Sequence, residues 1–180
     1  MAEVGTEPAP KKRQTKAAVE KVARSYFKAA ADRDADAMAD HWHPEGVDDL
    51  IPVGVMRGPA EVREFFSDVF GAMPDAEMVV DRVVADSHAA AVQWRMTGTF
   101  RGRPFMGIDP NGRRVELRGI DCLEIEDGKI VRNTAVYDGA TFARAIGMLP
   151  SRDSGGERAM IAAFNAANRV RSAVRERMAR

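Results

Sequence analysis

Apolar residues recur at helical spacing in the first part of the chain. Intervals of three and four residues predict a helix over residues 17–31, with one apolar stripe made by Val19, Val22, Tyr26, Phe27 and Ala30. Asp34 suits the N-cap of a second short helix over residues 34–42. A short strand is expected over residues 47–53. Gly58-Pro59 then begins a third helix, because proline is accepted at the first helical position.

After residue 74 the apolar period changes from 3.6 to 2. Four strands are predicted, over residues 77–85, 89–100, 114–126 and 129–137. The Asp127-Gly128 pair favours a tight hairpin turn between the last two strands. Helices followed by a run of antiparallel strands indicate an α+β fold in which helices cover one face of the sheet. A short helix over residues 141–146 and a long one over residues 157–178 complete the chain.

Composition narrows the class of protein. The 180 residues carry 27 Lys and Arg against 27 Asp and Glu, so the chain lacks the net field of a nucleic-acid binder. Its single cysteine allows no intrachain disulfide, and no apolar run approaches the length that spans a membrane. These features predict a cytoplasmic protein that binds neither nucleic acid nor membrane. Residues 1–16 are expected to form a disordered tail, whose Lys11-Lys12-Arg13 cluster either binds anions or only aids solubility.

Several segments resemble the SnoaL-like polyketide cyclase family. They are HWHPEG, MRGPAEVREFF, WRMTGTFRGRPFMGIDPNGRRVELRGID, EIEDGKI and AVYDGATFARAIGMLP. The family belongs to the cone-shaped α+β barrels, which include nuclear transport factor, ketosteroid isomerase and limonene epoxide hydrolase. The resemblance covers about residues 18–150. It implies a cone domain over residues 17–150, with a curved, mainly antiparallel sheet wrapped on the N-terminal helices. Residues 151–180 would form a C-terminal helical extension, expected to dock on the body or on a partner subunit.

Asp121 interrupts the apolar face of its predicted strand. Val115, Leu117, Gly119, Leu123 and Ile125 alternate with polar residues, so this face should point into the cone with Asp121 among them. A buried carboxyl needs donors or a raised pKa, and a carboxyl kept near neutrality can transfer protons. Asp121 also falls where ketosteroid isomerases carry a hydrogen-bonding aspartic acid. Either a catalytic or a purely structural role fits this pattern.

Asp138 ends the following strand, at the position of an aspartate found across the SnoaL-like family. It either joins Asp121 in the cone as a second catalytic carboxyl or caps the helix at Thr141. Regular alternation from Ile130 puts Thr134 on the inner face of this strand, where related chains usually carry an aromatic residue. Ketosteroid isomerases place a base before a Pro-Val-Gly turn; here Ile51 stands there, and Asp48 and Asp49 are out of register.

Five further residues are candidates for binding a substrate. Trp94 and Met96 share a strand face and form either core or a wall for a planar molecule, while Tyr26 could donate its hydroxyl. His43 ends the second helix as either a pocket base or an ordinary surface residue, and Thr134 completes the set. No metal site is expected, because the calcium-loop pattern that begins at Asp32 fails at its sixth and twelfth positions.

The resemblance implies a cofactor-independent cyclase or isomerase. A carboxylate would remove a proton α to a carbonyl of a hydrophobic polyketide- or steroid-like molecule. Two alternatives remain: a non-catalytic ligand-binding or assembly module, and epoxide hydration by an Asp121–Asp138 pair. A homodimer is expected through the outer sheet face, which carries Ile120, Cys122 and Val131. A cavity with unsaturated aspartates would favour catalysis, whereas an Asp121 locked by several donors would favour the structural role.

Overall fold

The computed structural model describes residues 14–178, which begin with two helices. α1 (Lys16–Asp32) is capped by Thr15, whose side chain accepts a hydrogen bond from the Ala18 amide. α2 (Ala35–Ala39) is capped in the same way by Asp34. The Lys11-Lys12-Arg13 cluster and most of the expected N-terminal tail lie outside the described residues. Gln14 is placed against the body, because its side chain donates to the Ile125 carbonyl at 2.7 Å.

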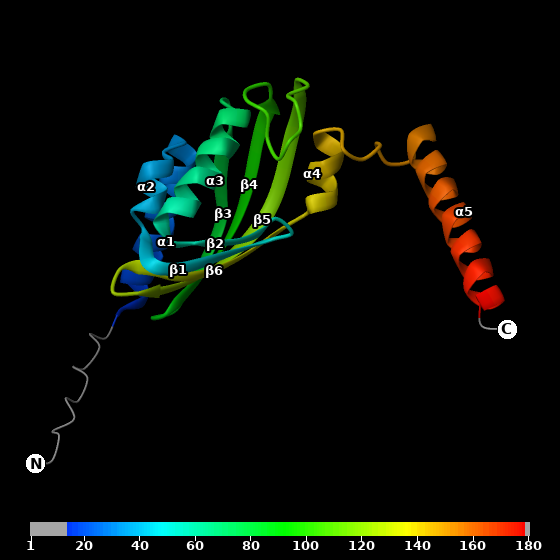
Figure 1. Cartoon of the computed structure of the whole chain (residues 1–180). Helices are drawn as coiled ribbons and strands as arrows, with labels where there is room; N and C mark the ends of the chain where they lie inside the picture. The colour runs from blue at the N-terminus through cyan, green and yellow to red at the C-terminus, as the bar shows by residue number, and fades with distance from the viewer. Residues whose placement is uncertain (1–13, 179–180) are drawn as a thin grey trace, which may run out of the picture.

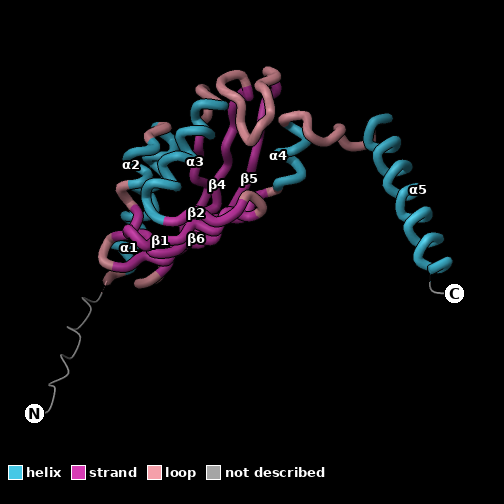
Figure 2. The backbone as a smooth tube through the Cα atoms, viewed as in Figure 1, coloured by secondary structure: helices cyan, strands magenta, loops and turns pink. Residues whose placement is uncertain are grey.

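Six strands form one curved, open sheet in the order β2-β1-β6-β5-β4-β3 (Figure 2). β1 (Trp42–Ile51) and β6 (Lys129–Tyr137) pair in parallel, and every other neighbouring pair is antiparallel. The other strands are β2 (Gly54–Arg57), β3 (Glu77–Ala85), β4 (Ala89–Phe100) and β5 (Arg113–Glu126). This is the predicted α+β fold, with a mainly antiparallel sheet.

Helices α1, α2 and α3 (Gly58–Ala72) lie together against the concave face of the sheet (Figure 1). α1 and α3 turn apolar stripes toward the strands, and the core forms between the two layers. The helices therefore cover only one face of the sheet. The change of the apolar period from 3.6 to 2 along the chain predicts this arrangement. The loop over residues 101–112 joins β4 to β5 and folds back near the end of α3, where the Arg103 amide bonds to the Gly71 carbonyl.

Three elements differ from the sequence prediction. The strand expected over residues 47–53 is β1, which begins at Trp42 and ends at Ile51, and a further short strand, β2, follows it. The second helix ends at Ala39 instead of residue 42, because Trp42 already begins β1 and pairs with Ile130 of β6. Long-range strand pairing here overrides the local helical signal. In β6 the pairing with β5 shifts between Ile130 and Arg132, so Val131 is an extra residue in the ladder. Such a bulge reverses the inward and outward faces of the residues that follow it.

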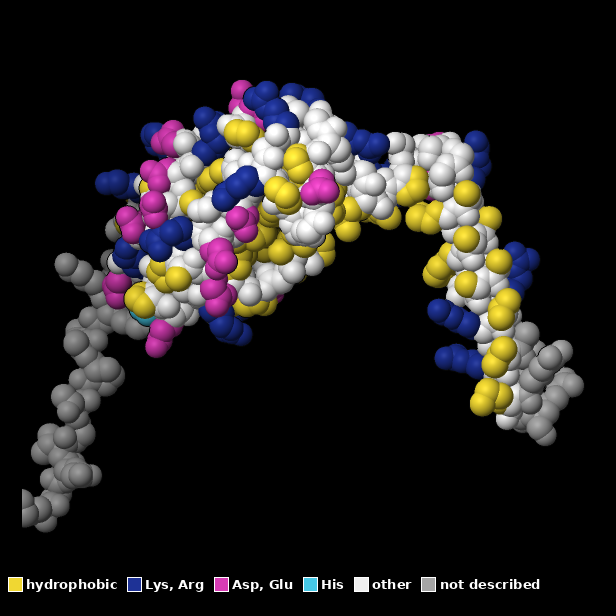
Figure 3. All heavy atoms as spheres, turned by 45° about the horizontal axis from the view of Figure 1, so that its top comes forward, with side chains coloured by type: hydrophobic (Ala, Val, Ile, Leu, Met, Phe, Trp, Pro, Cys, Tyr) yellow, Lys and Arg dark blue, Asp and Glu magenta, His cyan; other side chains and the backbone are white. Residues whose placement is uncertain are grey.

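Two helices follow the sheet. α4 (Gly139–Ala145) lies at one end of the cone, and α5 (Gly155–Met178) stands apart from it (Figure 1). A row of apolar side chains runs along α5 (Figure 3), and its Phe164 and Val170 are both 64% exposed. The expected docking of this helix on its own body is therefore not observed, and docking on a partner subunit stays a prediction. No helix among residues 14–178 is long and apolar enough to cross a membrane.

Candidate active site

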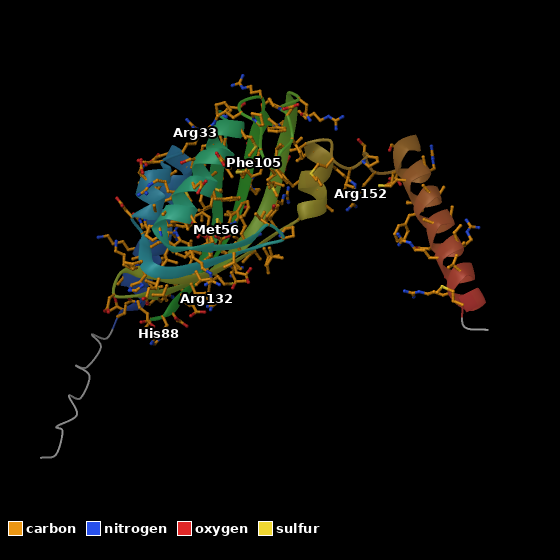
Figure 4. All side chains as sticks on the ribbon, viewed as in Figure 1. Arg33, Met56, His88, Phe105, Arg132 and Arg152 are labelled. Atoms are coloured by element: carbon orange, nitrogen blue, oxygen red, sulfur yellow. The ribbon has the colours of Figure 1, made fainter. Side chains whose placement is uncertain are left out.

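A cavity lies between the concave sheet face and the helices. Its volume, including the part open to solvent, is about 700 Å³, and most of the side chains around it are apolar or aromatic. Phe105 from the β4–β5 loop and Phe142 from α4 are in its wall. Figure 4 shows Phe105 far along the sheet from His88, which lies in the β3–β4 turn. The cavity has the apolar and aromatic lining of a site for a small molecule.

Asp121 lies in the wall of this cavity, on the inner face of β5, as alternation predicts. Both of its carboxyl oxygens accept hydrogen bonds. Trp94 Nε1 donates to Oδ1 at 2.7 Å, and Asn133 Nδ2 donates to Oδ2 at 2.8 Å. Burial raises the pKa of Asp121 to about 6, and the two donors oppose that rise because they stabilise the charged form.

A second carboxyl, Asp48 of β1, shares the cavity with Asp121. It is 1% exposed, and its Oδ1 accepts a hydrogen bond from Asn133 Nδ2 at 3.0 Å. Burial raises the pKa of Asp48 to about 7, and the charge of Asp121 adds to the rise. In the sequence, Asp48 is out of register with the base of ketosteroid isomerases. The signal that could have found it is the alternation of Gly46, Asp48 and Leu50 on the buried face of β1.

Asn133 of β6 connects the two carboxyls. Its single amide nitrogen donates to both, which fixes the amide orientation, because the reverse orientation would turn the amide oxygen toward two carboxylates. Asn133 Oδ1 is buried without a partner among the described residues. Sequence reasoning missed Asn133 because regular alternation from Ile130 places it outside. The extra residue at Val131 turns Asn133 inward and Thr134 away from the cavity.

Three predicted binding residues do line the cavity, namely Tyr26, Trp94 and Met96. The Tyr26 hydroxyl is buried and has no hydrogen-bond partner among the described residues. Burial, followed by the charges of Asp48 and Asp121, holds the pKa of Tyr26 well above its usual value. The phenol therefore stays neutral and can donate a hydrogen bond to a ligand.

The other three predicted site residues lie outside the cavity. Asp138 is exposed and caps α4, accepting hydrogen bonds from Thr141 N at 3.0 Å and Thr141 Oγ1 at 2.7 Å. These bonds lower the pKa of Asp138. Asp138 is therefore a helix cap, and it does not form a catalytic pair with Asp121. His43 is exposed on β1, where its Nδ1 accepts from the Glu45 amide, and Thr134 is turned away by the bulge in β6.

Comparisons with known proteins agree with this architecture. The model of the family described as SnoaL-like polyketide cyclase matches residues 20–146. The chain belongs to this family. A search of the curated proteins finds no match. Across residues 14–178, no group of three His, Cys, Asp or Glu side chains is arranged to hold a metal ion.

Solved structures of other proteins share this fold. AclR of Streptomyces galilaeus, described as a candidate hydroxylase, is 25% identical over 76% of this chain and 100% of its own, with a TM-score of 0.67. A candidate SnoaL-like polyketide cyclase from Jannaschia sp. CCS1 is 21% identical over 81% and 100%, with a TM-score of 0.68. IdmH, a candidate polyketide cyclase of Streptomyces antibioticus, is 21% identical over 71% and 97%, with a TM-score of 0.60.

Proposed function

We propose that this SnoaL-like protein is a cofactor-independent cyclase or isomerase of secondary metabolism. It would act in the cytoplasm on a hydrophobic polyketide- or steroid-like molecule and remove a proton α to a carbonyl. The observation that carries the proposal is the pair of buried carboxyls, Asp48 and Asp121, in the wall of an apolar cavity. A general base works best when its pKa lies near the working pH, and burial brings both carboxyls toward that range.

The remaining wall suits the other requirements of this chemistry. Removal of the proton leaves negative charge on the carbonyl oxygen, and a neutral donor in a dry site stabilises that charge. Tyr26 offers such a donor, because its hydroxyl is buried, neutral and without a partner among the described residues. Aromatic side chains such as Trp94 and Phe105 offer flat apolar contact to a polycyclic ligand.

A non-catalytic ligand-binding or assembly module is the second candidate. Two observations favour it: both oxygens of Asp121 already accept hydrogen bonds, and the apolar side chains of α5 lie exposed. A module of this kind would hold an apolar ligand in the same cavity without turning it over. A measurement of turnover, and not one of ligand binding, distinguishes this module from an enzyme.

Native mass spectrometry of the protein purified from its own host tests the ligand class. We expect a co-purifying apolar molecule that carries a carbonyl group. Ala135→Phe should abolish its retention, because Ala135 is buried in the cavity wall. Val136→Phe is the matched control, since Val136 is the next residue of β6 and is 49% exposed. Retention of the ligand by Ala135→Phe, or a strongly polar ligand, would contradict the proposal.

A further inference from the structure

The two cavity carboxyls differ in how many hydrogen bonds they accept. Both oxygens of Asp121 are occupied, one by Trp94 Nε1 and the other by Asn133 Nδ2. Asp48 accepts only through Oδ1, and no donor of residues 14–178 reaches its Oδ2. N–H donors stabilise a carboxylate against protonation, and Asp121 has two where Asp48 has one that is longer. A proton added to this pair of carboxyls is therefore bound preferentially by Asp48.

Packing fixes both donors of Asp121. Trp94 stands opposite Gly119 in the β4–β5 ladder, and Asp121 follows two residues later on the same face of β5. The six-membered ring of Trp94 covers Gly119, because a Cβ atom there would lie 2.2 Å from Trp94 Cζ2. The missing side chain at position 119 thus lets the indole lie across β5 and reach Asp121. An indole N–H can only donate a hydrogen bond, so this contact opposes protonation of Asp121 Oδ1.

The charged surroundings of Asp48 favour the same location. The titratable groups that act on it are Asp121 from β5, its neighbour Asp49 and, from α1, the hydroxyl of Tyr26. No cation of the described chain is among them. With Asp121 ionised, a second negative charge beside it in an apolar cavity is unfavourable, and protonation of Asp48 removes it.

We infer that Asp48 exchanges a proton with the ligand through its unoccupied Oδ2, while Asp121, held by Trp94 and Asn133, remains an anion. This inference rests on the proposed acid–base function. In the forward step the Asp48 carboxylate takes the proton from the carbon α to the carbonyl, and the C–H electron pair becomes the enolate double bond. Asp48 then returns the proton, so no oxidant, reductant or cofactor takes part. Trp94, Asn133 and Gly119 are positioning residues that act through Asp121.

Carbon-13 NMR of aspartate-labelled protein between about pH 4 and 9 tests where the proton resides. Asp48→Asn and Asp121→Asn assign the two carboxyl carbons. We expect the higher of the two titration steps to appear mainly at the Asp48 carbon and the lower step mainly at the Asp121 carbon. The reverse distribution, or equal shares of both steps, would overturn the inference. The titration needs no substrate, so its outcome is separate from that of the proposed function.

Trp94→Phe tests the positioning role in the same experiment. Loss of the indole donor should raise the pH of the Asp121 titration step by about one unit or more. Part of the higher of the two steps should then appear at the Asp121 carboxyl carbon. Gly119→Ala should act in the same direction, because it displaces the indole. Trp42→Phe is the control, since Trp42 is also a buried tryptophan but donates to neither carboxyl. Unchanged titrations in both Trp94→Phe and Gly119→Ala would show that the indole does not hold Asp121 as an anion.

Discussion

At the scale of single residues, Asp48 and Asp121 predict different responses to the same substitution. Asp121→Asn turns an amide NH2 toward Trp94 or Asn133, so one buried donor loses its acceptor. Asp48→Asn can keep its carbonyl oxygen toward Asn133 and turn its NH2 toward the unoccupied side. We expect Asp121→Asn to lower the free energy of unfolding by about 1–3 kcal/mol relative to Asp48→Asn. Urea denaturation above pH 7 measures this difference, and equal stabilities would show that the Trp94 and Asn133 contacts are not specific to a carboxylate.

The raised pKa values of the two carboxyls also predict how stability depends on pH. Between about pH 4 and 7 the folded protein holds protons on Asp48 and Asp121 that the unfolded chain has released. Stability is then greatest near the unfolded pKa and falls as pH rises through the folded values. Carboxyls nearer the surface, such as Asp75 and Asp86, have lowered pKa values and act in the opposite direction, below about pH 4.

We therefore expect the free energy of unfolding to decrease by more than about 1 kcal/mol from pH 4.5 to pH 7.5. Asp48→Asn should flatten this dependence, because it removes the group with the larger pKa shift. Asp49→Asn is a matched control from the same strand. Unfolding curves at several pH values measure the slope, and a slope in Asp48→Asn equal to that of the natural chain would contradict this assignment.

At the scale of elements, Asp138 tests the difference between a cap and a catalytic group. Asp138→Ala removes the acceptor for Thr141 N and Thr141 Oγ1 at the start of α4. We expect a loss of about 0.5–2 kcal/mol in the free energy of unfolding, with turnover per folded molecule unchanged. Asp138→Asn should restore most of the stability. A loss of turnover with unchanged stability would instead return Asp138 to the active site.

The strands also show how far sequence can lead toward this site. Alternation in β5 predicts an inward Asp121, because that strand has no irregularity from Val115 to Leu123. In β6 the same reasoning selects Thr134 instead of Asn133, because the bulge at Val131 depends on pairing with β5 and leaves no local signal. Asp48 was missed for a different reason: it is out of register with the base of ketosteroid isomerases, although Gly46, Asp48 and Leu50 alternate on the buried face of β1. The helices and the long strands were predictable from local periodicity, whereas contacts between strands decide which polar side chains meet.

At the scale of the whole molecule, the outer sheet face carries exposed apolar side chains. Ile120 and Val136 pair across β5 and β6 there and are each 49% exposed, and Cys122, two residues further along β5, is exposed as well. We expect a homodimer that buries this face, because exposed apolar patches on a sheet mark contact surfaces. Light scattering should give twice the chain mass at micromolar concentration, and Ile120→Lys should give the monomer. Val170→Lys on α5 is the control that separates the sheet face from the C-terminal helix. If the natural chain were a monomer at every concentration, the prediction of a homodimer would be contradicted.

Deuterium exchange tests the acid–base claim most directly. The protein is incubated in D₂O with polycyclic ketones, or with the ligand found by native mass spectrometry, and deuterium α to the carbonyl is measured by mass spectrometry. We expect the natural chain to catalyse exchange, and Asp48→Asn to lower the rate per folded molecule by at least ~100-fold. Asp49→Asn, the neighbouring control, should keep most of the rate, because Asp49 acts on Asp48 only through its charge. If the Asp48→Asn and Asp121→Asn variants both exchanged deuterium at the full rate, proton transfer by these carboxyls would be contradicted. If the natural chain did not exchange deuterium into its own ligand, the protein would be a binding protein and not an enzyme.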